Sequence, residues 1–224
     1  MSLPLLAASR GLSVLFTTFF VSIISIISYD RVNSFDITRS LKLMSVDFSS
    51  NQINTMVDYV NRNREGYNQM REFKLEEKFS MEIGWIKFLG QCTQEWIKAT
   101  TNNKITKFNL RETWIVRQFK NEYNPIHWHG GHISGAGFLK VPNSLGKHVQ
   151  DKGSKDYQGG SLELIHGSSQ FLSSSKFKIT PKVGDFYFFP AYLMHTVYPF
   201  KGTDEERRSI SFNALIDENI YNSL

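Results

Sequence analysis

Hydrophobic residues recur with a helical period in two segments of the first half of the chain. Between residues 51 and 64 and again between residues 82 and 99, apolar side chains return every three or four positions, which is typical of amphipathic helices. The first helix can be capped by Ser49, Ser50 or Asn51. On the second helix one face carries Trp85, Phe88, Leu89, Cys92 and Trp96. We expect that face to pack against a sheet, and we expect the charged residues 62–80 to form a loop or an exposed helix.

The pattern changes to a period of two after about residue 104, and short β-rich runs follow one another. Turn-forming residues such as Asn124-Pro125, Gly159-Gly160 and Gly184-Asp185 separate these runs. Seven or eight short strands with this punctuation predict a sandwich, a barrel or a jelly roll, and helices that precede strands indicate the α+β class. The expected strands are 113–120, 134–141, 161–165, 176–180, 185–189, 194–198 and 207–216.

Composition limits the chemistry that the chain can carry. Of its 224 residues, 41% are hydrophobic and 21% are charged, which is typical of a folded globular protein. Cys92 is the single cysteine, so a disulfide framework and a thiolate metal cluster are both excluded. A metal site would therefore use His, Asp or Glu. The net charge of +5 comes from scattered residues and indicates ordinary solubility rather than a nucleic-acid partner.

An uncharged stretch, residues 12–28, lies near the N-terminus and reaches only the lower length limit for a membrane-spanning helix. It is rich in Ser and Thr, and no small-residue cleavage site follows it. Three interpretations stay open: a membrane anchor or uncleaved signal, a buried part of the domain, or an extension that the working protein does not need. The third interpretation would let a self-contained domain begin near Met44.

Three of the six histidines lie in one hexapeptide that runs from His127 to His132. On an extended segment, His127 and His129 would point to the same face, where two imidazoles can chelate one ion. The alternative for this pair is two loop histidines with no ligand role. His132 follows a Gly-Gly turn, and we expect that it is not a ligand, and neither are His148 and His166.

A third candidate ligand follows an aromatic strand near the end of the chain. Gly184-Asp185 begins this strand, Pro190 ends it, and His195 opens the next strand. In a jelly roll, this order of strands returns a late histidine to the side of an earlier H-x-H pair. Trp128 and Tyr192 flank these histidines in sequence, where they would either line a substrate entrance or pack into the fold.

The terminal strand separates into two faces. Arg207, Ser209, Ser211 and Asn213 point one way, whereas Arg208, Ile210 and Phe212 point the other. A polar row of this kind suits the wall of a wet cavity, in which Arg207 would offer a two-pronged donor to a carboxylate and Ser209 a hydroxyl. The alternative is a half-exposed edge strand whose polar face meets water.

These motifs together resemble a known family. The run from Glu122 to His129 is followed by Ser134-Gly135, by 138–142 and by 159–164. Two further motifs complete the pattern: Gly184-Asp185 through Pro190 to His195, and Arg207-x-Ser209-Ile210-Ser211-Phe212-Asn213. The set is similar to the iron(II)/2-oxoglutarate oxygenases of marine phages and bacteria, which are relatives of the prolyl 4-hydroxylase superfamily. The resemblance spans roughly residues 105–216.

The resemblance implies a double-stranded β-helix (jelly roll) braced by N-terminal helices, and a dioxygenase that hydroxylates a substrate of unknown identity. It implies iron(II) on His127, His129 and His195, with 2-oxoglutarate and dioxygen as small-molecule partners. The distal carboxylate of 2-oxoglutarate would then pair with Arg207 and Ser209. One position departs from the family, whose usual ligands are H-x-D/E and a distal histidine. His129 stands in place of that carboxylate, so the site has either three histidines or a water in the vacant position.

Two other functions stay open. A cupin-type metalloenzyme that does not use 2-oxoglutarate would share the H-x-H pair and the distal histidine, although its usual glutamate is replaced by Ile133. A non-catalytic jelly-roll binding module would leave the histidines unexplained. We expect an N-terminal extension at 1–45, a helical support region at 46–104 and the oxygenase domain at 105–218. The sequence favours a cytoplasmic protein, with membrane association through residues 12–28 as the alternative.

Overall fold

The computed structural model describes residues 44–47, 50–63, 71–146, 159–167 and 175–223. The apolar stretch 12–28 and His148 therefore lie outside the described residues. Within the described ranges, no helix combines the length and the apolarity that a membrane span needs.

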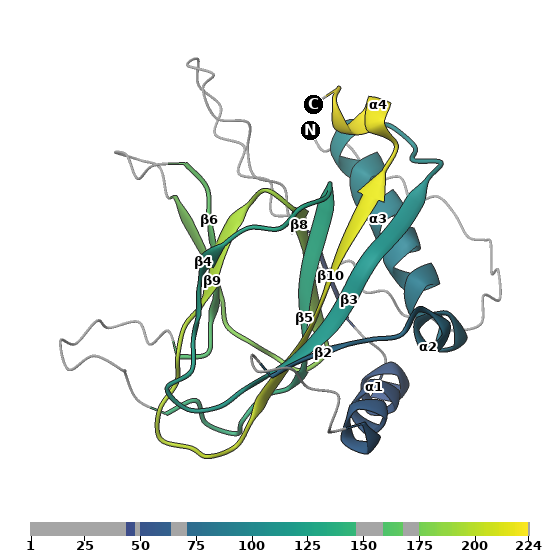
Figure 1. Ribbon diagram of the computed structural model, residues 1–224. Helices are drawn as coiled ribbons and strands as arrows, with labels where there is room; N and C mark the ends of the chain where they lie inside the picture. The colour runs from purple at the N-terminus through teal and green to yellow at the C-terminus, as the bar shows by residue number, and fades with distance from the viewer. Residues whose placement is uncertain (1–43, 48–49, 64–70, 147–158, 168–174, 224) are drawn as a thin grey trace, which may run out of the picture.

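Two antiparallel sheets face each other, and three helices cover the outer face of the larger one (Figure 1). The helices on that face are α1 (Ser50–Arg62), α2 (Glu77–Glu82) and α3 (Trp85–Thr101), and α4 (Glu218–Tyr221) follows the last strand. The architecture is the expected α+β double-stranded β-helix with bracing helices, which confirms the prediction of the fold class.

The larger sheet has six strands in the order β1-β8-β5-β10-β3-β2. The smaller sheet has four, in the order β4-β9-β6-β7. The strands of the larger sheet are β1 (Met44–Asp47), β8 (Asp185–Pro190), β5 (Ile133–Lys140), β10 (Arg207–Ile216), β3 (Phe108–Gln118) and β2 (Glu72–Lys74). Those of the smaller sheet are β4 (Asn124–His127), β9 (Met194–Val197), β6 (Leu162–Ile165) and β7 (Lys176–Ile179).

The sequence pattern did not indicate three of these strands. β1 and β2 are four and three residues long, too short to show a period, and β2 lies in the segment 62–80 that we expected to be a loop or an exposed helix. β4 contains Asn124-Pro125, which the sequence marked as a turn. Proline is tolerated there because β4 is an edge strand of the smaller sheet, where a missing N–H breaks no ladder.

Helix α3 packs its aromatic face onto the larger sheet, as its period predicted. Its side chains at Trp85, Phe88, Leu89, Cys92 and Trp96 are all buried. The Trp85 ring meets Phe186 of β8 edge-on at 5.6 Å, and its Nε1 donates to Thr113 Oγ1 at 3.1 Å. Thr113 in turn donates to the carbonyl of Ser211, so one helix is tied to β3 and β10 together.

β10 is an inner strand of the larger sheet, and both of its faces are buried. Its polar row is therefore not the water-facing side of a half-exposed edge strand. It pairs with β3 on one side and with β5 on the other. Ile210 and Phe212 join the core between the sheet and the helices. Ser209 and Ser211, on the opposite face, line a cavity between the two sheets.

A glycine on β5 makes room for the core and gives the first prediction. A Cβ at Gly137 would lie 2.2 Å from Phe186 Cδ2, whereas one at Gly90 in α3 would meet Phe108 at an ordinary 3.4 Å. Gly137→Ala should therefore lower the free energy of unfolding by about 1–3 kcal/mol through overpacking. Gly90→Ala should change it little or raise it by up to about 1 kcal/mol, because alanine favours helix. Urea denaturation of both variants measures this, and equal stability of the two would contradict the packing.

A second prediction concerns the start of the folded domain. Met44 is the first residue of β1, which pairs with β8 through Met44↔Phe188 and Asp47↔Asp185. A chain that begins at Met44 keeps this strand and every candidate ligand, so it should fold and bind metal as the full chain does. Circular dichroism and metal content check this. An insoluble shortened chain beside a soluble full chain would show that the preceding residues belong to the core.

Candidate metal centre

The sequence-predicted histidines meet where β4 pairs with β9. His127 and His195 are opposite each other in the register of this antiparallel pair, and His129 follows β4 two residues later. Their ring centroids are 4.2 Å apart for His127 and His195, and 5.0 Å apart for each of the other two pairs. One nitrogen from each ring lies within 4.8 Å of the others, a spacing that lets the three rings share one ion.

Backbone carbonyls set the tautomers of two of these rings. Nδ1 of His127 lies 2.6 Å from the carbonyl oxygen of Pro125, and Nδ1 of His195 lies 2.9 Å from that of Leu193. Since a carbonyl oxygen can only accept, each Nδ1 carries the proton, and each Nε2 keeps a lone pair free for a metal. In known metal sites, a hydrogen bond of this kind to the second ring nitrogen orients the ligating histidine.

The electrostatic surroundings keep two of these rings uncharged at neutral pH. Burial and, to a smaller extent, the neighbouring His127 lower the pKa of His129 to about 4. Burial also lowers the pKa of His195 to about 4, against the hydrogen bond to Leu193 that raises it. Neutral imidazole is the form that binds metal, so neither His129 nor His195 has to lose a proton before an ion enters at pH 7.

No carboxylate joins this cluster among the residues that the structure describes. The two carboxylates of the motif region lie elsewhere, in line with their sequence spacing. Glu163 is buried, accepts a hydrogen bond from Tyr198 Oη at 3.1 Å and pairs with Lys176 at 3.0 Å. Asp185 lies beside the Tyr187 hydroxyl at 3.4 Å.

His132, the third histidine of the hexapeptide, lies apart from the cluster. Its Nδ1 accepts the backbone N–H of Ile216 at 3.1 Å, its ring stacks on Tyr221 at 4.0 Å, and its Nε2 lies 3.5 Å from Glu218. These contacts fasten the end of β10 and α4 to the loop that carries His129. That His132 is not a ligand therefore stays a prediction.

A cavity of about 850 Å³ between the two sheets joins the histidines to the polar row of β10. Arg207, Ser209 and Ser211 line it together with His127, His129 and His195. β3, the neighbour of β10 in the same sheet, adds Glu112, Trp114 and Val116, which the sequence did not single out. Trp128 and Tyr192 are 66% and 57% exposed and are not among the lining residues, so they do not pack into the fold.

Arg207 is the most deeply buried charged residue that lines this cavity. Its side chain is only 2% exposed, and burial lowers its pKa to about 10. Its Nη1 approaches Ser209 Oγ at 3.4 Å, and its guanidinium lies 5.0 Å from the centroid of the Phe138 ring. Among the described residues its Nε finds no hydrogen-bond acceptor, and no carboxylate pairs with the guanidinium.

Arg208 has the opposite environment, which confirms the assignment of the two strand faces. It points to the helices, where it pairs with Glu206 and donates to Asn61 Oδ1 at 3.1 Å and to the carbonyl of Val57. Its charge is therefore neutralised within the protein. Of the two adjacent arginines, Arg207 is the one available to an anion in the cavity.

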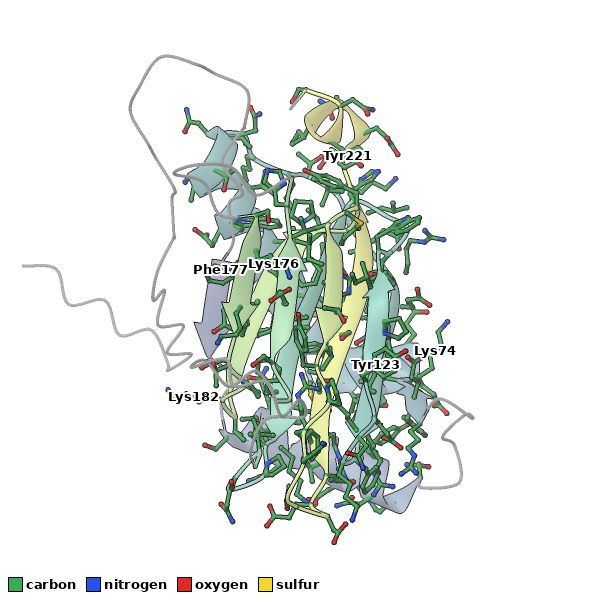
Figure 2. The ribbon with its side chains drawn as sticks, turned by 90° about the vertical axis from the view of Figure 1, so that its left-hand side faces the viewer. Lys74, Tyr123, Lys176, Phe177, Lys182 and Tyr221 are labelled. Atoms are coloured by element: carbon green, nitrogen blue, oxygen red, sulfur yellow. The ribbon has the colours of Figure 1, made fainter. Side chains whose placement is uncertain are left out.

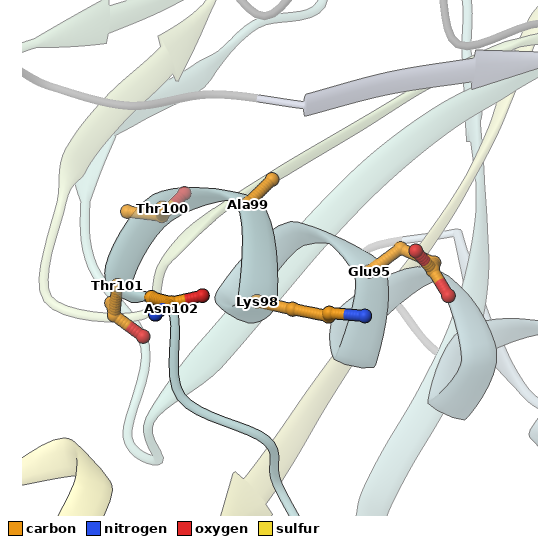
Figure 3. A pocket seen from close by; sticks show the side chains of 6 residues that line it. All are labelled: Glu95, Lys98, Ala99, Thr100, Thr101 and Asn102. Carbon is orange, nitrogen blue, oxygen red and sulfur yellow. The ribbon is translucent and has the colours of Figure 1, made fainter.

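A second hollow lies at the C-terminal end of α3 and has no comparable chemistry (Figure 3). It is a surface feature of the last turns of one helix and contains no histidine. Its lining consists of Glu95, Lys98, Ala99, Thr100, Thr101 and Asn102. We therefore assign the functional site to the cavity between the sheets.

A known protein family matches the part of the chain that contains this site. Residues 112–213, which include the three histidines and Arg207, match the family described as "Putative 2OG-Fe(II) oxygenase". No curated protein matches the sequence.

Solved structures share the fold at low sequence identity. The viral collagen prolyl hydroxylase of Paramecium bursaria Chlorella virus-1 aligns with a TM-score of 0.53 and 16% identity, over 78% of this chain and 90% of its own. A Pseudomonas putida prolyl-4-hydroxylase aligns with a TM-score of 0.52 and 13% identity, over 76% and 91% of the two chains. An oxidoreductase of the 2OG-Fe(II) oxygenase family from Burkholderia pseudomallei aligns with a TM-score of 0.52 and 13% identity, over 77% of this chain and 83% of its own.

The family match and the fold lead to the same assignment. The eight strands from β3 to β10 form the double-stranded β-helix that these structures share, and the match spans most of them. Within residues 112–213, the chain is therefore similar to the 2OG-Fe(II) oxygenase family in sequence, and its fold is that of the solved prolyl hydroxylases.

Proposed function

We propose that this protein is an iron(II)- and 2-oxoglutarate-dependent dioxygenase, in which His127, His129 and His195 hold the iron. Arg207, with Ser209, holds the distal carboxylate of 2-oxoglutarate. The observation that carries the proposal is the buried Arg207, whose charge lacks a carboxylate among the described residues and which shares one cavity with the three histidines.

The energy of a buried charge supports an anionic ligand at this position. An ion removed from water without a partner costs several kcal/mol, and proteins retain such a group where a ligand or a function compensates it. A guanidinium presents two parallel N–H donors, which match the two oxygens of a carboxylate. The Ser209 hydroxyl beside it can add a third donor once it turns toward the ligand.

The donor set suits iron(II). Imidazole nitrogen binds iron, zinc, copper and nickel, and three such ligands on one side leave further positions open. Bound iron, together with 2-oxoglutarate and dioxygen, supplies oxidative decarboxylation to succinate and hydroxylation of a second substrate. The protein contributes three imidazole ligands, two of them on the paired strands β4 and β9, an arginine that orients the co-substrate, and apolar walls such as Leu162 and Phe189 that limit water.

A cupin-type enzyme and a binding module are weaker candidates. A cupin-type metalloenzyme that does not use 2-oxoglutarate would account for the three histidines but not for the buried, cavity-facing Arg207. A non-catalytic binding module would account for neither the histidines nor Arg207.

The metal ligands can be tested by substitution. Metal affinity should fall when any one of the three ligands is replaced by alanine, as in His127→Ala, His129→Ala and His195→Ala. Each variant should bind iron(II) or cobalt(II) at least tenfold more weakly, on the order of 1.4 kcal/mol for each factor of ten, because a coordination bond is lost.

The other histidines serve as controls. His166→Ala should leave metal affinity unchanged. His132→Ala should also leave the bound metal unchanged but reduce thermal stability, since it removes the contacts to Ile216 and Tyr221. Anaerobic calorimetry measures the metal affinity of each variant. If His132→Ala lost the metal while His127→Ala bound it fully, the ligand pair would be His129 and His132.

The arginine can be tested separately. Removal of one side of a buried ion pair costs about 2–5 kcal/mol, so Arg207→Ala should weaken 2-oxoglutarate binding roughly thirtyfold or more. Arg207→Lys should also weaken it, because lysine keeps the charge and loses the paired donors. Arg208→Ala is the matched control: it should lower stability through the loss of Glu206 pairing and change 2-oxoglutarate affinity far less.

The two arginine variants distinguish the outcomes when 2-oxoglutarate affinity is measured on folded, metal-loaded protein. If Arg208→Ala abolished binding and Arg207→Ala did not, the assignment of the strand faces would be wrong. If neither substitution mattered, the 2-oxoglutarate assignment itself would fail.

A further inference from the structure

A carboxylate on β3 is held against the cavity by neighbours fixed in the sheet. Glu112 is opposite Asn213 in the register of β3 and β10, and Asn213 Nδ2 donates to Glu112 Oε1 at 3.0 Å. Asn213 is in turn fixed by Ser134, whose hydroxyl donates to its Oδ1 at 2.9 Å. Asn213 and Ser134 are both buried. The hydrogen bond from Asn213 lowers the pKa of Glu112, so this carboxylate is ionised at neutral pH.

This carboxylate lies beside the proposed iron ligands, along an aromatic wall. Trp114, two residues further on the same face of β3, meets the His129 ring at 5.3 Å in an edge arrangement. A carboxylate next to an indole ring is a combination that attracts organic cations, by ion pairing and by cation–π contact.

The present partner of Glu112 is an exposed lysine on the edge of the sheet. Lys74, on the edge strand β2, approaches Glu112 Oε2 at 3.5 Å, and the two side chains are 69% and 43% exposed. Exposed pairs of this kind contribute about 0–1 kcal/mol, so an incoming cation can replace the lysine at little cost. Figure 2 shows Lys74 on the same edge of the molecule as Tyr123, another residue of the cavity lining.

The other charges that line the cavity differ from Glu112 in their surroundings. Arg71 pairs with Glu122 at 3.2 Å, and Arg117 pairs with the buried Glu206. Glu72, the remaining carboxylate of the lining, lies on the edge strand β2. Arg207 is the buried cation that the proposed co-substrate would neutralise. Glu112 is thus a carboxylate that the sheet anchors through Asn213 and whose exposed partner, Lys74, can be displaced.

We propose that Glu112, together with Trp114, binds a positively charged group of the hydroxylated substrate, an alkyl amine or a guanidine. The assignment rests on the proposed function, because it takes the metal as the reference point of the substrate site. Glu112 acts here as a specificity-determining residue: it replaces its contact to Lys74 by one to the substrate and so fixes the substrate chain beside His129.

The test uses full-length protein loaded with cobalt(II) and 2-oxoglutarate, under argon. Butylammonium, 1-butanol and butyrate serve as probes, since they share a four-carbon chain and differ in charge. Cobalt(II) shortens the proton relaxation times of a molecule bound near it, so NMR titration gives both affinity and proximity without turnover. Glu112→Gln removes the charge and keeps an acceptor for Asn213, and Glu72→Gln is the matched control, since it removes one charge from the same cavity wall.

Butylammonium should bind close to the metal about tenfold more tightly than 1-butanol, and butyrate should not compete there. Glu112→Gln should abolish this preference, Glu72→Gln should retain it, and Lys74→Met should strengthen butylammonium binding severalfold. Equal binding of the alcohol and the ammonium, or an equal loss in both glutamate variants, would overturn the inference. Failure to take up cobalt and 2-oxoglutarate would instead overturn the proposed function.

Discussion

The pairing of β4 with β9 is the constraint on which the candidate site depends. It sets His127 directly opposite His195, and the alternation of side chains turns both rings into the space between the sheets. A shift of this register by one residue would turn one ring to the outer face and dismantle the cluster. The carbonyls of Pro125 and Leu193, two residues before each histidine, then fix both rings with the same local hydrogen bond.

β10 links this cluster to the rest of the molecule. Its helix-facing side chains fill the core under α1 and α3, and its cavity-facing side chains supply the polar wall, so one strand serves stability and ligand binding through opposite faces. The two adjacent arginines, Arg207 and Arg208, show this difference between the two faces of β10. Arg208 is neutralised inside the protein by Glu206, whereas Arg207 is buried on the cavity side, where a ligand can compensate its charge. The bracing helices hold this strand rigid, which keeps the guanidinium in place.

Much of this arrangement could be predicted from local sequence pattern, because helix α3 and strand β10 are long enough to show a period and because the histidines alternate. What the pattern did not indicate depends on tertiary contacts. β2 and β4 are stabilised by their neighbours and have no period of their own, and Asn124-Pro125 is typical of a turn. The role of Glu112 was not visible either, since only the pairing with Asn213 brings it to the cavity. Trp128 was placed near the site by sequence proximity, but alternation turns it outward.

We propose that the three histidines and Arg207 form one oxygenase site that consumes 2-oxoglutarate. The decisive measurement is the formation of succinate from 2-oxoglutarate by the iron(II)-loaded protein in the presence of dioxygen, with His195→Ala and Arg207→Ala as paired controls. The protein should release succinate slowly in the absence of a second substrate, only with iron and dioxygen present, and both variants should release far less. If the protein bound iron and 2-oxoglutarate but released no succinate, or if both variants released as much as the unchanged protein, the proposed site would be wrong.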